Sequence, residues 1–322
     1  MKISQNIYLE NFKNKRFDNK IFKLFKDLIK KKNQVIYSLN KSYKYSYTKK
    51  TILKFKKYPQ IRLIGMGGSI LGANAIYSFL KNKIKKTFIF IDTLNVNENL
   101  KNNKKKFLNL IISKSGNTLE TIINTNVLIK SNQKNIFITE NKNSYLYHLA
   151  EKLKSDIVYH NNYIGGRYSV LSEVGMLPAE LMGLNYKNFR QLNNLVKNKF
   201  FMKALVSNVE ATIYLLKLKK FNSIIINYDE QSINLFNWYQ QLIAESLGKE
   251  KKGILPIISI MPKDNHSVMQ LYLDGFKNNF FTFFYSHENN PAKINNESVL
   301  LEQKYLKNKD INQIMYAQKK AT

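Results

Sequence analysis

The spacing of the hydrophobic positions changes at about residue 60. Before it, apolar residues such as Ile21, Phe25 and Leu28 recur every three to four positions among lysines, which predicts one or two amphipathic helices with a solvated basic face. After it, short apolar runs alternate with helical stretches, a pattern typical of a parallel sheet covered by helices on both faces. The predicted fold class is therefore α/β, with an N-terminal helical extension.

The alternation after residue 60 predicts two α/β units. In the first unit we expect strands at 61–64, 88–91, 108–112, 136–138 and 156–159, and helices at 70–82, 118–131 and 143–154. A long helical region over about 170–220, with a break near Gly183, joins the units. In the second unit we expect strands at 223–227, 256–261 and 279–286, and helices at 231–247 and 266–275. We place the extension at 1–58, the first domain at 59–187 and the second domain, expected to be incomplete at its C-terminus, at 188–322.

The composition excludes several classes of protein. The chain has 322 residues, of which 44% are hydrophobic, so it is long enough to bury a substantial core. It has no cysteine, which excludes a disulfide scaffold, a thiolate zinc site and a cysteine nucleophile. No apolar run approaches the ~20 residues that span a bilayer, and the N-terminus lacks the apolar core of a signal peptide. We therefore expect a cytoplasmic protein with no membrane partner.

The formal net charge of +30 raises the hypothesis of nucleic-acid binding. Only four of the 52 basic residues are arginine, however, and proteins that grip phosphate backbones usually exploit the arginine fork. Lys, Asn, Ile, Phe and Tyr are abundant whereas Gly and Arg are scarce, which is the pattern of an AT-rich genome. We therefore attribute the charge mainly to genome composition and expect no nucleic-acid partner. The same bias makes the retained glycines and arginines informative.

Two candidate binding segments follow predicted strands and open helices. In the segment from Gly65 to Ser69, three glycines would let backbone N–H groups face one pocket, which favours anion binding; a tight turn under close helix packing is the alternative. The second segment, from Ser113 to Thr121, brings several hydroxyls and one lysine to a helix N-terminus, which suits a phosphate monoester. Simple capping of the helix is the alternative there.

Three further segments carry candidate catalytic groups. A glycine pair precedes Arg167, which could hold the negative charge of an oxyanion or serve only a structural role. Gln241 and Glu245 lie four positions apart and so share a helical face, where the glutamate could be a general base or an ordinary surface residue. His266, one of four histidines, lies at the start of a predicted helix and could act in acid–base catalysis or be structural.

Taken together and in this order, the five segments resemble the phosphoglucose isomerase family, whose members have two sugar-isomerase (SIS) domains. The similarity covers about residues 60–275. The motifs that carry it are Gly65-x-Gly-Gly68-Ser69-x-Leu-Gly72, Ser113-Lys-Ser115-x-x-Thr118-x-Glu-Thr121, Gly165-Gly166-Arg167-x-Ser169, Gln241-x-x-x-Glu245-Ser-x-Gly248-Lys249 and His266-Ser267-x-x-Gln270. The resemblance implies two SIS-type domains, each a parallel sheet flanked by helices.

The resemblance also implies a reaction, the interconversion of glucose 6-phosphate and fructose 6-phosphate through a cis-enediol, a step of glycolysis and gluconeogenesis that needs no metal or other cofactor. Glu245 would move the proton between C1 and C2, and Arg167 would stabilise the negative charge of the intermediate. His266 would assist ring opening and would come from the partner subunit of a homodimer. The residues implied to bind the substrate are Gly68, Ser69, Ser113, Lys114 (through its backbone), Ser115, Thr118, Thr121 and Gln241.

Two alternatives remain open from the sequence. The family has a further catalytic lysine beyond the histidine motif, and Lys319 and Lys320 lack its expected surroundings, so a truncated, inactive isomerase is one hypothesis. A non-catalytic SIS protein that binds sugar phosphates is the other. The joint presence of Glu245, Arg167 and His266 favours the enzyme.

Overall fold

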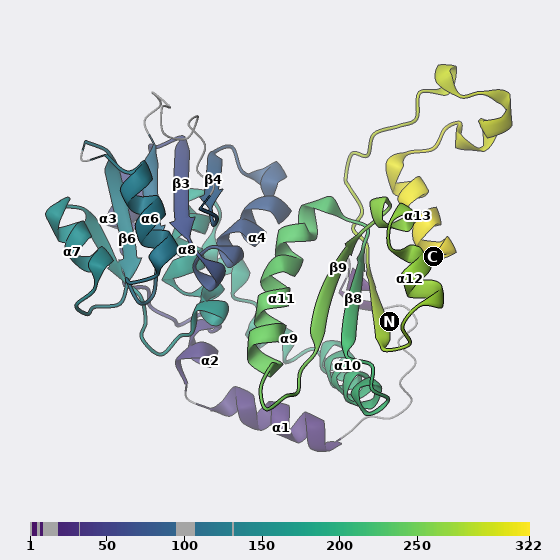
Figure 1. The fold of residues 1–322 in the computed structure, drawn as a ribbon, viewed down its shortest axis with the longest axis horizontal. Coiled ribbons are helices and arrows are strands. Elements are labelled where there is room, and N and C mark those ends of the chain that lie inside the picture. The colour runs from purple at the N-terminus through teal and green to yellow at the C-terminus, as the bar shows by residue number, and fades with distance from the viewer. Residues whose placement is uncertain (1, 5–6, 9–18, 32, 95–106, 131) are drawn as a thin grey trace.

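The computed structural model describes residues 2–4, 7–8, 19–31, 33–94, 107–130 and 132–322, in which two parallel sheets are surrounded by helices (Figure 1). The strands of the larger sheet are β3 (Gln60–Gly65), β4 (Thr87–Ile91), β5 (Leu108–Ile112), β6 (Lys134–Thr139) and β7 (Asp156–Tyr159). They are parallel, in the order β4-β3-β5-β6-β7. These are the five strands predicted for the first unit, and the α/β fold class is confirmed.

The larger sheet is covered on both faces. Every residue of β5 is buried, as is every residue of β3 after Gln60, which is why these strands are apolar except for Arg62 and Asn109. On one face Leu63 and Leu110 pack with α4 (Leu71–Phe79) and α8 (Glu173–Leu181). On the other face Ile111 and Phe137 pack with α6 (Leu119–Leu128) and α7 (Tyr145–Lys152).

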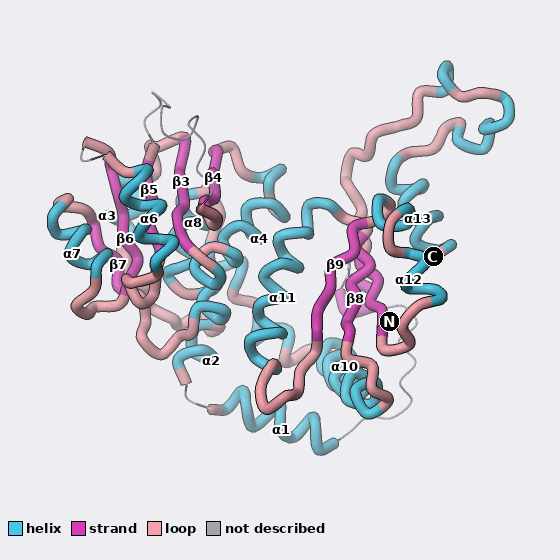
Figure 2. The backbone as a smooth tube through the Cα atoms, viewed as in Figure 1, coloured by secondary structure: helices cyan, strands magenta, loops and turns pink. Residues whose placement is uncertain are grey.

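The smaller sheet has three parallel strands, β8 (Asn222–Asn227), β9 (Leu255–Ile260) and β10 (Asn279–Phe284), in the order β10-β8-β9. The helix α11 (Ile233–Leu247) lies between the two sheets and packs against α4 (Figures 1 and 2). The helices α12 (Met269–Asp274) and α13 (Ile311–Ala321) lie on the opposite side of the smaller sheet (Figure 1). The strands predicted for the second unit are therefore confirmed.

The remaining helices precede and join the two sheets. The N-terminal region forms α1 (Asn19–Lys30), α2 (Gln34–Ser38) and α3 (Lys49–Phe55), and α1 contacts α10 (Lys199–Lys217). Three helices thus form where one or two were predicted, and α1 buries none of its residues, the apolar ones of its predicted packing face included. The sequence did not predict the short antiparallel pair β1 (Lys2–Ser4) and β2 (Ile7–Tyr8), and the part of the predicted extension at 9–18 lies outside the described residues.

The break predicted near Gly183 is confirmed. Helix α8 ends at Leu181, and the backbone of Gly183 has a positive φ of 92°, which favours glycine. The short helix α9 (Leu192–Leu195) then leads to α10. Within the described ranges, no helix combines the length and the apolar character needed to cross a membrane.

The strand order of the larger sheet indicates where a ligand would bind. The chain runs from β3 to β4 on one side, and then to β5 on the other side of β3. In open α/β sheets a ligand usually binds at such a reversal of strand order, at the carboxyl ends of the strands, which here are those of β3 and β5. The two predicted binding segments are the loops that follow β3 and β5.

Candidate active site

The two candidate binding loops leave the larger sheet side by side. Gly65, the last residue of β3, is paired with Ile112, the last residue of β5. A Cβ atom added to Gly65 would lie 3.0 Å from the carbonyl oxygen of Ile112, so the two strand ends are in close contact. The segment that starts at Gly65 and the hydroxyl segment, defined here as Ser113 to Thr121, therefore begin at the same level of the sheet.

The glycines after β3 allow two loops to pack backbone to backbone. The turn η1 (Gly67–Ser69) lies against the turn η3 (Gly166–Leu171). A Cβ atom on Gly68 would lie 2.2 Å from the carbonyl carbon of Gly166, so no side chain fits there. The hydroxyl of Ser169 donates to the carbonyl of Gly166 at 2.7 Å and contacts that of Gly68 at 3.3 Å. Close packing, the alternative stated above, thus accounts for Gly68, and this packing places the Arg167 segment beside η1.

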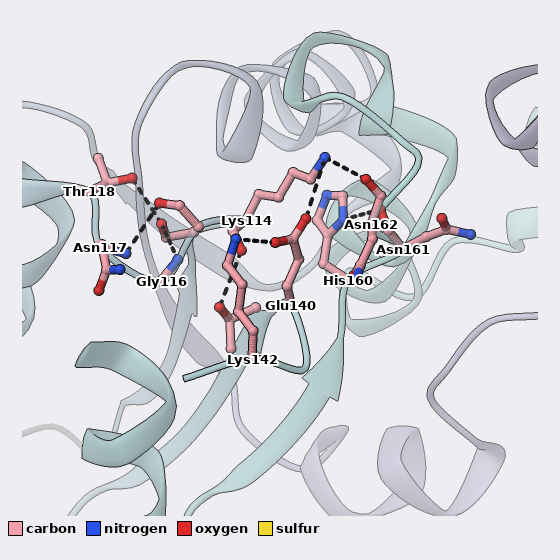
Figure 3. Close-up of polar contacts among 12 residues, drawn as sticks. Lys114, Gly116, Asn117, Thr118, Glu140, Lys142, His160, Asn161 and Asn162 are labelled. Atoms are coloured by element: carbon pink, nitrogen blue, oxygen red, sulfur yellow. Dashed lines mark hydrogen bonds and ion pairs between the residues drawn. The ribbon is translucent and has the colours of Figure 1, made fainter. Parts of the chain in front are cut away.

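The hydroxyl segment is folded on itself before α6 begins (Figure 3). The Ser113 hydroxyl lies 2.9 Å from that of Thr118 and accepts the backbone N–H of Gly116 at 3.2 Å. The Ser115 hydroxyl accepts the N–H of Asn117. The φ of Gly116 is +68°, and a Cβ atom there would lie 2.1 Å from the Ser144 hydroxyl, so only glycine fits. The segment therefore gathers hydroxyls at the N-terminus of a ten-residue helix, where anions are stabilised.

Two of the other polar residues of this segment, Lys114 and Thr121, are placed differently. Lys114 turns its side chain away from Asn117 and Thr118 and donates to the carbonyl of Asn162 at 2.8 Å (Figure 3). Thr121 is fully buried in α6, and its hydroxyl has no hydrogen-bond partner among the described residues. The backbone of Lys114, and not its ammonium, is therefore the part that lies within the loop.

Arg167 reaches across to α11, the helix between the two sheets. Its Nη1 donates to Glu245 Oε1 at 2.8 Å, and its Nε donates to Ser246 Oγ at 2.9 Å. Its guanidinium also stacks on the ring of Tyr168, 4.5 Å from the centroid. Although partial burial lowers the pKa of Arg167, its interactions with Tyr168 and Glu245 raise that pKa above the ordinary value. The arginine is thus a fixed cation held between η3 and α11.

Gln241 and Glu245 share one face of α11, as their spacing predicts. Gln241 Nε2 lies 3.3 Å from Glu245 Oε2, and a Cβ atom on Gly67 would lie 2.9 Å from the same nitrogen. The Glu245 side chain is 52% exposed, against 18% for that of Arg167. An accessible carboxylate beside a fixed guanidinium can accept a proton while the cation stabilises the charge that develops.

His266 lies apart from these groups, and its predicted local position was wrong. It is the last residue of the turn η6 (Lys263–His266), and α12 starts only at Met269, because Asp264 holds the turn by accepting the N–H of Ile260 at 2.7 Å. The His266 side chain is exposed, and no hydrogen bond or ion pair links it to the side chain or backbone of another described residue. It leads into α12, on the side of the smaller sheet opposite α11 (Figure 1).

The sequence analysis missed three residues that hold Arg167. Ser246 accepts from the arginine Nε, Tyr168 provides the stacking ring, and the indole of Trp238 donates to the Arg167 carbonyl at 3.2 Å. The sequence did carry signals for these residues. Tyr168 and Ser246 each directly follow a candidate residue, and Trp238 is the only tryptophan of the chain. Among the described residues, no three His, Asp or Glu side chains gather as a metal site.

Known proteins that are similar to this chain point to one family. The family model of phosphoglucose isomerase matches residues 29–253. A glucose-6-phosphate isomerase of Methanocaldococcus jannaschii is 38% identical over 243 residues, which are 70% of this chain and 60% of that protein. A glucose-6-phosphate isomerase of Mycoplasmoides gallisepticum is 31% identical over 296 residues, which are 83% of this chain and 69% of that protein. The chain thus spans about 60–69% of the length of these relatives.

Solved structures show the same fold. A hypothetical protein from Thermus thermophilus superposes with a TM-score of 0.74 at 22% identity and covers 94% of this chain and 78% of its own. A glucose-6-phosphate isomerase from Chlamydia trachomatis superposes with a TM-score of 0.65 at 19% identity and covers 84% of this chain and 57% of its own. At these identities the likeness concerns the fold alone.

Proposed function

The chain belongs to the phosphoglucose isomerase family, and on that premise we propose that it interconverts glucose 6-phosphate and fructose 6-phosphate. The observation that carries the proposal is the meeting of Arg167 with Glu245 at 2.8 Å. The arginine comes from the loop packed on η1, and the glutamate comes from α11 of the other domain. A general base and a fixed cation are the two groups that an enediolate intermediate requires.

In the proposed mechanism Glu245 accepts the proton of C2 from the open-chain aldose and returns it to C1. The electron pair of the broken C–H bond forms the double bond of a cis-enediolate, and Arg167 stabilises the negative charge on its oxygen. A proton passes between the two oxygens as the carbonyl moves from C1 to C2. Gln241, beside the carboxylate, orients the substrate, and Gly68 and Ser69 line the sugar pocket.

The phosphate would be held by the hydroxyl segment. Ser113, Ser115 and Thr118 provide hydroxyls at the N-terminus of α6, together with the backbone of Lys114. Thr121 completes the set that the resemblance implies, although its hydroxyl is buried within α6 and has no partner among the described residues. These donors recognise a phosphate monoester through hydrogen bonds and the helix dipole.

We further propose that His266 acts in the active site of a partner subunit. Within one described chain it makes no contact with Glu245 or Arg167, so a homodimer would be needed to bring it to the substrate for ring opening. The enzyme would act in the cytoplasm, in glycolysis and gluconeogenesis, with domains at 59–187 and 188–322 after the extension at 1–58.

A coupled assay for the conversion of fructose 6-phosphate tests the proposed base. We expect Glu245→Gln to lower kcat by about 10²–10⁴-fold while binding of fructose 6-phosphate persists. The exposed Glu230→Gln, just before α11, is the matched control and should keep full activity. Unchanged activity of Glu245→Gln would contradict the mechanism. A wild-type chain that binds fructose 6-phosphate without converting it would favour the non-catalytic alternative.

Mixing two inactive variants tests the shared site. In a heterodimer of Glu245→Gln and His266→Ala, one site carries both substitutions and the other carries neither, so about a quarter of wild-type activity should return at random pairing. No recovery from subunits that exchange would place His266 in its own chain's site or outside catalysis.

A further inference from the structure

Lys114 lies in the hydroxyl segment, yet its ammonium is bound outside that segment. Its Nζ donates to the carbonyl of Asn162, after β7, at 2.8 Å and lies 3.5 Å from Glu140 Oε1, after β6 (Figure 3). The side chain therefore bridges the ends of three neighbouring strands, β5, β6 and β7. An ammonium with these two acceptors is directed away from the hydroxyls of the loop.

Glu140 contacts both the backbone carbonyl and the side-chain ammonium of Lys114. Its backbone N–H donates to the Lys114 carbonyl at 3.1 Å, and its carboxylate pairs with the Lys114 ammonium. The second carboxylate oxygen lies 2.5 Å from Lys142 Nζ. The Glu140 side chain is only 8% exposed, so its position is fixed by these partners. The hydroxyl of Thr139 adds a longer contact of 3.4 Å to the same Lys114 carbonyl.

The charges of Glu140, Lys114 and Lys142 explain why the contact between Glu140 and Lys114 is stable. Burial raises the pKa of the Glu140 carboxyl, but the ammonium groups of Lys142 and Lys114 together hold that pKa below its ordinary value. The carboxylate is therefore charged at neutral pH. A nearly buried carboxylate is stable only when it is paired, and here two lysines pair with it. One net positive charge remains beside the hydroxyl segment.

We propose that Glu140 is a positioning residue for the recognition of the sugar phosphate. Its backbone N–H holds the Lys114 carbonyl in any variant, and its carboxylate, by holding the Lys114 ammonium, keeps the hydroxyl segment in the shape that presents its N–H groups and hydroxyls to the phosphate. The phosphate is then bound by neutral donors, and Lys114 contributes its charge from a distance. This inference rests on the proposed function of the same site.

A different role for Glu140 would predict the opposite change in affinity for the phosphate. If the carboxylate only kept the Lys114 ammonium away from the phosphate, its removal would free a cation for the ligand, and binding would become tighter. If Glu140 shapes the loop, its removal weakens binding. The sign of the change in affinity therefore separates the two roles.

The test compares wild type with Glu140→Gln, Glu140→Asp and the control Glu151→Gln, whose carboxyl is exposed on α7. The readouts are kcat and KM for fructose 6-phosphate and the inhibition constant of inorganic phosphate. We expect Glu140→Gln to raise KM and the inhibition constant about tenfold, ~1.4 kcal/mol, with kcat within about twofold. Glu140→Asp, which keeps the charge but is shorter by one methylene, should fall between, and Glu151→Gln should match wild type.

An unchanged or lower KM and inhibition constant in Glu140→Gln would overturn the proposal, as would a loss confined to kcat. If thermal melting shows that Glu140→Gln does not fold, the KM of Glu140→Asp decides by the same criterion. If the wild-type chain lacks isomerase activity, the proposed function fails, and calorimetric dissociation constants for fructose 6-phosphate still test the role of Glu140. A wild type that binds neither ligand overturns both.

Discussion

The two sheets have the same local strand order but differ in burial. In each, the first strand lies between the second and the third, as β3 lies between β4 and β5, and β8 between β9 and β10. Every residue of β5 is buried, whereas β10 has one buried residue, at its start. Helix α11, which packs on the smaller sheet, has no buried residue. The loops that need a fixed shape therefore stand on the buried sheet, and the accessible carboxylate comes from the more exposed unit.

Replacing one phenylalanine by alanine in each sheet should give the largest difference in stability between the two sheets. Phe137 in β6 is fully buried, so Phe137→Ala should lower the free energy of unfolding by about 3–5 kcal/mol. Phe281 in β10 is 41% exposed, so Phe281→Ala should cost about 1 kcal/mol or less. Urea unfolding followed by circular dichroism measures both values. Equal losses would show that the smaller sheet is covered in solution as fully as the larger one.

The contact between the loops of the first domain gives the next largest effect. Gly68→Ala forces a Cβ atom into the backbone of Gly166, so we expect a loss of about 1–3 kcal/mol in stability and a large loss of isomerase activity. The reciprocal Gly166→Ala is the control, because its Cβ atom would lie 3.7 Å from Gly68 Cα, an ordinary contact. If Gly68→Ala and Gly166→Ala had equal effects, the turns η1 and η3 could separate without loss of stability or activity.

A smaller effect is expected where the two domains meet. Ser246→Ala removes the acceptor of the Arg167 Nε but leaves the Glu245 carboxylate in place. Since a hydrogen bond to a charged group contributes about 1.5–3 kcal/mol, kcat should fall about tenfold or more while KM stays within about twofold. Ser78→Ala on α4, whose hydroxyl bonds only to carbonyls of its own helix, is the control. A change in KM alone would contradict an orienting role for Ser246.

The smallest expected effect is a pH dependence of thermal stability that comes from His160, beside the larger sheet. Burial lowers the pKa of His160, which follows β7. The unfolded chain therefore takes up a proton at about pH 6.5 while the folded chain still excludes it, so the contribution to stability is complete above pH 6.5 and is lost as the pH falls toward the folded pKa. Between pH 7.5 and 5.5, wild type should lose about 1–3 °C more in Tm than His160→Gln. The exposed His148→Gln should keep the wild-type slope, and identical slopes in all three would exclude this role.

The sequence predicted the fold well because local patterns determine it. The apolar runs of β3 and β5 and the glycine break at Gly183 are visible in the order of residues, and the structure contains them. The prediction that a helix starts at His266 was wrong, because the side chain of Asp264 holds a separate turn there. The pairing of β1 with β2 was missed because so short a pair leaves no periodic signal.

The candidate site was predicted in part. The spacing of Gln241 and Glu245 placed them on one helical face, since four residues make about one turn. No local pattern could show that Ser246 would meet Arg167, or that Glu140 would hold Lys114, because those contacts depend on how separate elements pack. The structure was needed to show that Gly68 contacts backbone and that the Lys114 ammonium leaves its own loop.

The link between Arg167 and Glu245 joins positions 78 apart in the chain, and it has a consequence for the order of folding. Contacts between distant positions form late, because a long loop must first be closed. The hydroxyl segment depends only on neighbouring strands of the larger sheet, which lie earlier in the chain. We therefore expect secondary structure to return before activity on refolding. During synthesis, which proceeds from the N-terminus, the hydroxyl segment would be formed before Glu245 has been added to the growing chain.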